Sequence, residues 1–273
     1  MEHADRHTHL PDAERMSLLT VMLLLVFALA HFIRLPGSEL SIQLPGLYLG
    51  IQLGVRELVA LLLVLLTTSG ADWLLSSHPH MGESRRYDHW LLPGITSWAI
   101  GLPLFQLPIS PTWWIGFALG IILIVLVLFA EYIVVDTHDL RHPPAAAGLT
   151  AVAFALYLVL AAALRFTGFR LLLLLPALAL GVFLISLRVI RLNQQTGWGF
   201  WEAALITLIT VQIATPLYYL PLNPVTYGLV LLGPAYALTN FFRDLEADKP
   251  VSKALLEPLV VLMIIWIIAL IIR

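Results

Sequence analysis

The sequence predicts an all-α polytopic membrane protein of about nine transmembrane helices, arranged as one helix followed by two tandem four-helix repeats, with a short β-hairpin on the outer face. Composition, long uncharged apolar runs and two similar proline-rich segments lead to this prediction. Hydrophobic residues make up 60% of the chain and charged residues 12%, whereas a soluble domain carries roughly a quarter charged residues. So small a charged fraction cannot cover a surface that faces water, and we expect the chain to lie in lipid.

The uncharged runs predict the number of spans, because a helix needs roughly 20 apolar residues to cross a bilayer. Two of the runs are long enough for two spans each, and each has a proline-rich turn in its middle, at Leu107–Pro111 and Leu220–Pro224. The predicted spans lie in Met16–Ile33, Leu58–Leu75, His89–Ala130 (two), Ala145–Leu164, Leu171–Leu187, Ala203–Phe242 (two) and Ala254–Ile272. A count of eight spans stays open.

The first apolar stretch follows a polar segment, residues 1–15, which we expect to form a cytoplasmic tail. The stretch is too long for the hydrophobic region of a signal peptide and lacks a small-residue cleavage site, so residues 16–35 are predicted to be a retained first span. Lys and Arg are more numerous on the side of this tail, ten against five. This bias favours an N-terminus in the cytoplasm, and the short loops suggest a bacterial cytoplasmic membrane.

The chain contains no cysteine, which excludes disulfides, thiolate metal sites, iron–sulfur clusters and S-palmitoylation. It also lacks a run of Lys and Arg, so nothing in the sequence supports nucleic-acid binding. The partners that we expect are the lipid bilayer, an apolar or lipid-like small molecule, and another membrane protein.

Residues 36–54 have the pattern of strands rather than of a helix. Apolar residues alternate with polar or small ones on both sides of Pro45-Gly46, a pair suited to a type II turn. This alternation predicts a β-hairpin on the outer face. Its polar edge groups cannot face hydrocarbon, so it would rest at the interface or cap the helices. An irregular interfacial loop is the alternative.

The two proline-rich segments match each other at a constant offset of 113 residues. The prolines that coincide are Pro103 with Pro216, Pro108 with Pro221, and Pro111 with Pro224. Each proline fixes φ and removes a hydrogen-bond donor, so three in register impose a shared backbone geometry. Residues 55–165 and 166–273 are therefore predicted to be tandem four-helix repeats, related by a pseudo-two-fold axis along the membrane normal. The alternative is a chance likeness of two turns.

Glu131 is the first candidate for a functional residue, because it lies within the apolar run that ends the fourth span. Ionisable groups inside spans are costly and usually face a cavity or a partner. At the offset of the repeat Glu131 corresponds to Asp244, and we expect Arg243 to be its partner across the interface of the repeats. A boundary carboxylate that reaches headgroup water is an equal alternative.

A second group of candidates, Asp136, His138 and Asp139, lies in the loop that follows. His138 and His142 are four residues apart, a spacing at which two helical side chains share a face and can both reach a metal. Pro143 disfavours helical backbone at His142, so we interpret the segment as a solvated turn. Di-iron chemistry of the membrane desaturase kind would need further histidine clusters that the chain lacks.

The third group of candidates is Asn240, Asp244 and Asp248, with Arg243 beside them. This Asn-x-x-x-Asp-x-x-x-Asp string resembles one motif of the intramembrane prenyltransferases of the UbiA type, which also have nine helices in two similar halves. The resemblance implies Mg²⁺ held against a diphosphate at the cytoplasmic face. It covers nine residues, and the family's acidic motifs end its second and sixth helices, whereas this string ends the fourth helix of a repeat. A charged helix boundary is the plainer interpretation.

Three functions therefore remain open. The first is transport or binding of an apolar or lipid-like small molecule, which the repeat and the interrupted helices favour. The second is the role of an accessory subunit in a membrane complex. The third is a divalent-metal-dependent lipid or prenyl transferase at the cytoplasmic face. No cofactor and no confident metal site can be assigned, and the first two functions are preferred to catalysis because no catalytic signature is present.

Overall fold

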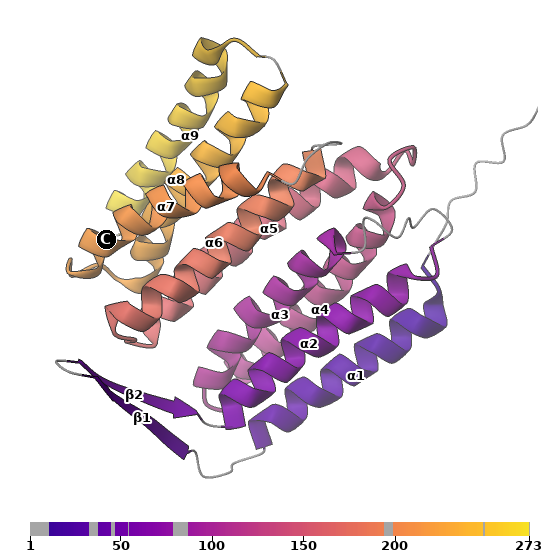
Figure 1. Ribbon diagram of the computed structural model, residues 1–273. Helices are drawn as coiled ribbons and strands as arrows, with labels where there is room; N and C mark the ends of the chain where they lie inside the picture. The colour runs from indigo at the N-terminus through magenta and orange to yellow at the C-terminus, as the bar shows by residue number, and fades with distance from the viewer. Residues whose placement is uncertain are drawn as a thin grey trace, which may run out of the picture.

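The computed structural model describes residues 11–32, 38–44, 47–53, 55–78, 87–193, 199–247 and 249–272. Within them the chain forms nine helices and two strands (Figure 1). In chain order these are α1 (Ala13–Phe32), β1 (Ser38–Leu44), β2 (Leu47–Leu53), α2 (Val55–Leu75), α3 (Asp88–Gln106), α4 (Pro111–Val134), α5 (His142–Phe166), α6 (Leu171–Asn193), α7 (Phe200–Tyr218), α8 (Pro224–Glu246) and α9 (Val251–Ile272). Seven of the helices, α2 and α4 to α9, are long and apolar enough to cross a membrane. The chain is thus a polytopic integral membrane protein that spans the lipid bilayer with helices.

The helix α3 is not among the seven, and its position explains its composition. It packs against α1, α2, α4, α5 and α6, so its neighbours are protein rather than lipid. A helix surrounded in this way does not need an apolar surface on every side. The buried hydroxyls of Thr96 and Ser97 donate to carbonyls of the same helix, at 2.6 and 2.9 Å. Proline at 93 and 103 is accommodated in the same buried helix.

The two proline-rich turns begin α4 and α8 in the same way. Ser110 precedes α4, and its hydroxyl accepts a hydrogen bond from the backbone N–H of Trp113, at 3.3 Å. Asn223 precedes α8, and its side-chain oxygen accepts from the N–H of Thr226, at 2.7 Å. A proline follows each cap at the first helical position, where its missing N–H costs nothing. These local signals fix where both helices start.

The strands β1 and β2 pair antiparallel, from Ser38 opposite Leu53 to Leu44 opposite Leu47. They lie near the end of the bundle where α1 ends and α2 begins (Figure 1). Pro45 and Gly46, the predicted turn, lie outside the described residues. The role of this pair as a hairpin that caps the outer face stays a prediction.

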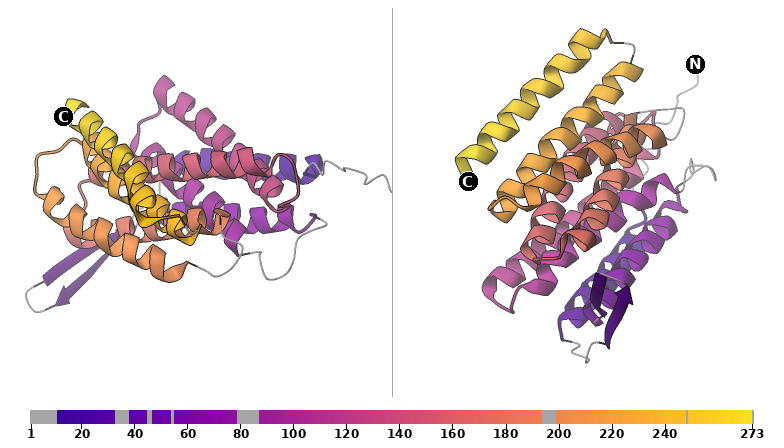
Figure 2. Two further views of the ribbon diagram at one scale, coloured as in Figure 1. Left: turned by 90° about the horizontal axis from the view of Figure 1, so that it is seen from above. Right: turned by 60° about the vertical axis from the view of Figure 1, so that its left-hand side comes forward.

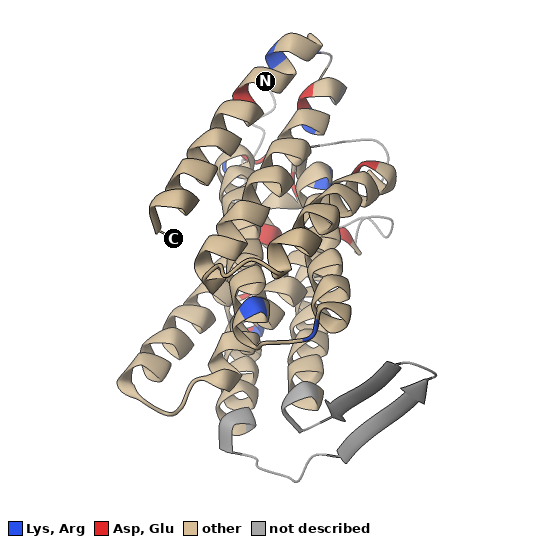
Figure 3. Cartoon of the chain, turned by 90° about the vertical axis from the view of Figure 1, so that its left-hand side faces the viewer, with Lys and Arg blue, Asp and Glu red and all other residues tan. Residues whose placement is uncertain are grey.

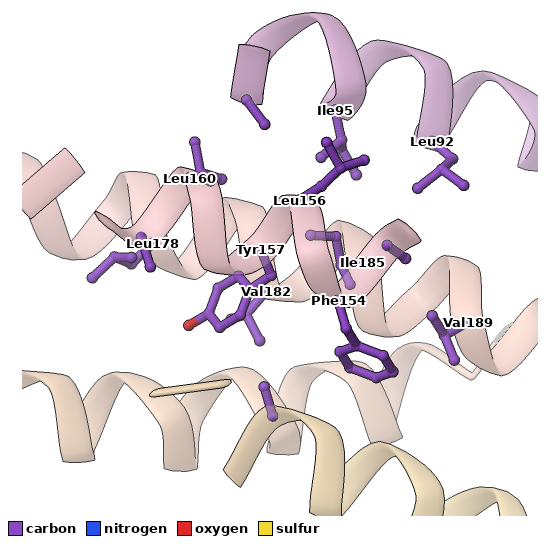
Figure 4. Packing of buried hydrophobic residues seen from close by; sticks show 14 of the residues in the cluster. Leu92, Ile95, Phe154, Leu156, Tyr157, Leu160, Leu178, Val182, Ile185 and Val189 are labelled. Carbon is purple, nitrogen blue, oxygen red and sulfur yellow. The ribbon is translucent and has the colours of Figure 1, made fainter. Parts of the chain in front are cut away.

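Two buried clusters hold the helices together. One is formed by α1, α2, α3 and α4, and its largest members include Phe27 and Trp113. The other joins α3 and α4 to α5, α6, α7 and α8, with Tyr157 at its centre (Figure 4). Since α3 and α4 contribute to both clusters, they connect the two parts of the molecule.

Close contacts of α8 with its neighbours depend on small residues, as is common where lipid supplies no hydrophobic drive for helix association. A Cβ at Gly228 of α8 would lie 3.1 Å from the carbonyl oxygen of Leu158 in α5. A Cβ at Gly233 would lie 3.0 Å from the indole nitrogen of Trp266 in α9. Larger side chains at either position would push α8 away from its neighbours.

The helix α9 packs against α8 and lies along the outside of the molecule (Figure 2). Only 11% of its apolar stretch is buried inside the chain, compared with 56% for α4, α6 and α8. Most of its surface is therefore left to lipid or to another membrane protein.

The alternating direction of the helices across the membrane can be tested with single cysteines, because the chain has none. Leu140 precedes α5 and Tyr219 follows α7, and both side chains are well exposed, at 79% and 74%. Three helices separate them, so they should lie on opposite sides of the membrane. If the N-terminus is cytoplasmic, as expected from the sequence, a membrane-impermeant maleimide should label Tyr219→Cys in intact cells and Leu140→Cys only after permeabilisation. The cysteine-free parent is the control. Labelling of both variants from the same side would contradict the spans proposed for α5, α6 and α7.

Candidate functional site

Glu131 is almost completely buried in the last turn of α4, with 1% of its surface exposed. Its carboxylate is bound by Arg188 of α6 and by His89 of α3. The Nε of Arg188 donates to Oε1 at 3.0 Å, and its Nη2 donates to Oε2. The Nδ1 of His89 lies 2.7 Å from the same Oε2. One carboxylate thus holds side chains from two other helices.

The contact with His89 fixes where the imidazole carries a proton. An ionised carboxylate only accepts hydrogen bonds, so Nδ1 of His89 must be the protonated nitrogen. The Nη2 of Arg188 is also 3.3 Å from this Nδ1, and both nitrogens are donors to Oε2. Glu131 is consequently the common acceptor of the network, and the positive charge of Arg188 balances its negative charge.

A second ion pair lies beside the first. Asp88 begins α3, and its Oδ2 accepts from Nε and Nη2 of Arg191, at 3.0 and 2.6 Å. The other carboxylate oxygen of Asp88 is buried and has no hydrogen-bond partner within the described residues. We call Asp88, His89, Glu131, Arg188 and Arg191 the ion network.

The order of the helices explains why these residues meet. Asp88 and His89 start α3, Glu131 lies near the end of α4, and the two arginines lie near the end of α6. In an alternating bundle these ends fall on one side of the membrane. Arg188 and Arg191 are three residues apart, so they share a face of α6, and that helix packs against α3.

The expected pairing of Glu131 with Arg243 is wrong. Arg243 lies on α8, which packs against α5, α6, α7 and α9. Its Nε is 3.6 Å from the carboxylate of its neighbour Asp244. The arginine that reaches Glu131 belongs instead to α6, which lies against α3.

The loop candidates Asp136, His138 and Asp139 form a turn stabilised from within. The carboxylate of Asp136 accepts from the backbone N–H of His138, at 2.9 Å, and Arg141 Nη2 donates to Asp139 at 2.9 Å. The hydrogen bond from Arg141 holds the pKa of the Asp139 carboxyl below its usual value. Because α5 starts at His142, His138 and His142 do not share a helical face.

The third group of candidates lies near the end of α8. The side-chain amide of Asn240 donates to the carbonyl of Tyr236 in its own helix, at 2.9 Å. Asp244 is buried, and Lys249 donates to it at 2.9 Å. Asp248 lies outside the described residues. Among the residues that are described, no group of three or more His, Asp or Glu side chains is arranged to hold a metal ion.

Sequence reasoning therefore identified Glu131 but missed four of its companions in the ion network. Arg188 and Arg191 follow the apolar run of the predicted sixth span or lie at its end, and Asp88 and His89 stand at the edge of the third. A usable signal exists, because each residue lies within two turns of a helix end that faces the same side. Such ends are where charges from different helices can meet.

The comparisons with known proteins give one match. A family model described as "Protein of unknown function (DUF5656)" matches residues 35–272, which include the whole ion network. No curated protein and no solved structure matches the chain.

The energetic weight of the ion network can be measured with Arg188→Gln. This change leaves Glu131 buried without its guanidinium partner, which should destabilise the protein by about 3–5 kcal/mol. Arg141→Gln is the matched control, because it breaks a partly exposed pair worth about 1 kcal/mol or less. Unfolding of the purified protein in mixed micelles reports both values.

A double variant, Glu131→Gln with Arg188→Gln, identifies the cause of the loss. Removing both charges should restore a good part of the stability, because no unpaired charge remains. If Arg188→Gln and Arg141→Gln had equally small effects, the buried pair would not hold α4 to α6.

Proposed function

The chain belongs to the DUF5656 family, and from the ion network and its surroundings we propose that it is a membrane carrier that binds an apolar or lipid-like small molecule. The observation that carries the proposal is the burial of Glu131 within a span, paired across helices with Arg188. Ionisable groups in such positions commonly mark a substrate or ion pathway.

The distribution of charge points to the class of ligand. Between its first two and last two turns, none of the nine described helices carries Asp, Glu, Lys or Arg. Figure 3 shows the helices mostly in tan, with charged residues sparse along them. The bundle therefore offers polar groups at its ends and apolar surface between them. A ligand that is apolar over most of its length, with a polar group at one end, fits this arrangement.

A carrier of this kind needs two parts that move against each other, and the packing supports a tandem repeat. Helix α1 packs on α2 and α4, as α5 packs on α6 and α8. The pairs α2–α3 and α3–α4 likewise match α6–α7 and α7–α8. Helices α4 and α8 are also capped in the same way, by Ser110 and Asn223, which supports their match in the repeat. The repeat predicted for residues 55–165 and 166–273 matches the same helices to each other, and from these contacts we propose to place its boundaries one helix earlier, as α1–α4 and α5–α8 with α9 added.

The ion network joins these two groups, because α3 and α4 belong to the first and α6 to the second. With nine spans and the N-terminus in the cytoplasm, it closes the cytoplasmic end. Separation of α6 from α3 and α4 would open that end to the ligand. The strands β1 and β2 would then lie at the outer end, in a cytoplasmic membrane.

One observation favours a second candidate function. The exposed apolar surface of α9 suits a helix of another membrane protein, as in an accessory subunit. The alternative of a metal-dependent transferase gains less support, because Lys249 occupies the carboxylate of Asp244.

Native mass spectrometry of the protein gently extracted from its own membrane tests the proposal. We expect a lipid-like molecule to remain bound in a fixed ratio, since a carrier's site excludes detergent. The matched variant is Asp244→Asn, which should leave this ligand in place. A divalent metal lost in Asp244→Asn would instead support the transferase, and a stable unrelated protein partner would support the subunit. A bare chain that takes up no added lipid would contradict the carrier.

A further inference from the structure

We propose that Arg165, Tyr218 and Tyr227 form a binding site for the phosphate group of a lipid-like amphiphile, at the end of the bundle opposite the ion network. The inference rests on the proposed function and names the head group of its ligand. Arg165 lies in the last turn of α5, Tyr218 ends α7 and Tyr227 lies in the first turn of α8.

The guanidinium of Arg165 is held in place from several sides. Its central carbon lies 4.9 Å from the centre of the Tyr218 ring and 5.4 Å from that of Tyr227. Its Nη2 donates to the carbonyl of Leu220, in the turn between α7 and α8, at 3.3 Å. The rings are themselves fixed, because the Tyr218 hydroxyl donates to the carbonyl of Phe169 and that of Tyr227 to Ala214, at 3.2 and 3.4 Å. Little side-chain freedom is left to be lost when a ligand binds.

The charge of Arg165 is not balanced by a carboxylate within the described residues, unlike the charges of Arg141, Arg188 and Arg191. The sequence from Leu140 to Trp201 contains no Asp or Glu, and the next acidic residues, Glu202 and Asp244, lie at the other end of the helices. The residues of α5–α8 at this end therefore include arginine but no acidic residue. Arginine is less frequent on the outer face of a membrane protein, and Arg165, which has no carboxylate partner within the described residues, can take an anionic ligand.

The chemistry of the site selects a phosphate. A guanidinium has five N–H donors in a planar fork, and one hydrogen bond to Leu220 is found for Arg165. The remaining donors match phosphate oxygens, which accept in pairs from such a fork. The two tyrosine rings beside the guanidinium give the site an apolar wall, against which the first part of an alkyl chain packs.

A second unused donor lies deeper in the same part of the protein. The hydroxyl of Tyr157 is buried without a hydrogen-bond partner within the described residues. Tyr157 belongs to the buried cluster that contains Tyr227, and in Figure 4 it points away from Leu92 and Ile95 of α3. It lies eight residues before Arg165 in α5, which is roughly 12 Å along a helix. A polar linkage behind the head group would supply the acceptor that this hydroxyl lacks.

Binding of dodecyl phosphate to the purified protein in dodecyl maltoside micelles tests the inference, with dodecanol and inorganic phosphate as the two reference probes. The wild-type chain should bind dodecyl phosphate saturably at one site and bind each reference probe far more weakly. Arg165→Gln should lower the affinity at least about tenfold, because it removes a charge-assisted pair. Arg165→Lys, which keeps the charge but lacks the fork, should recover only part of it.

The matched control is Arg170→Gln, which removes an equal charge five residues further on, at the same end of the bundle. It should bind dodecyl phosphate as the wild type does, and unfolding curves without ligand should show that each variant is folded. Equal losses in Arg165→Gln and Arg170→Gln would overturn the site, because net charge alone would then explain binding. If inorganic phosphate bound as tightly as dodecyl phosphate, the ligand would be free phosphate rather than the head group of an amphiphile. Equal binding of dodecanol would overturn the phosphate site yet leave a lipid-binding carrier intact, and failure of every amphiphile, with no lipid co-purified, would overturn both.

Discussion

The contact between Glu131 and Arg188 is the interaction on which the relative position of the helices depends. It joins α4 to α6, and through His89 it includes α3, so three helices meet around one carboxylate. A buried charge is tolerated only while it is paired. Sliding or rotation of α6 against α3 would separate the two charges inside the protein, whereas an apolar contact would adapt to such a shift. The pair therefore specifies the register of α6 against α3 and α4 more than it adds to the stability of the bundle.

The neighbouring pair of Asp88 and Arg191 repeats this constraint one helical turn away. Two ion pairs on the same face of α6 fix both its rotation about the helix axis and its position along that axis. Elsewhere the helices meet mostly through apolar clusters and small residues such as Gly228, which allow close approach without selecting a charge partner. The ion pairs thus lie near one end of the bundle, and the apolar contacts that can adapt to small shifts lie along its length.

The parts of the fold that were predicted from the sequence depend on local chemistry. Uncharged runs predict helices because each span must by itself present an apolar stretch long enough to cross the lipid. Asn223 with Pro224 marks a helix start within one turn. The partner of Glu131 could not be found in this way. Arg188 and Arg243 both lie near helix ends on the same side of the bundle, and only the helix that packs on α3 can bring its arginine to Glu131. That packing is decided by contacts along the whole chain. Asp88 and His89 were not predicted as site residues for the same reason, because the residues that they bind are distant in sequence.

The peripheral position of α9 has a consequence for how the molecule folds and opens. Neither buried cluster contains a residue of this helix, and its described attachments are to α8, among them the hydrogen bond from the Trp266 indole to the carbonyl of Val230, at 3.2 Å. Local stability in proteins is divided among cooperative units that open separately. Because its described contacts are with one neighbour, the last helix can dock after the other helices have assembled, and its separation from α8 would leave both buried clusters intact.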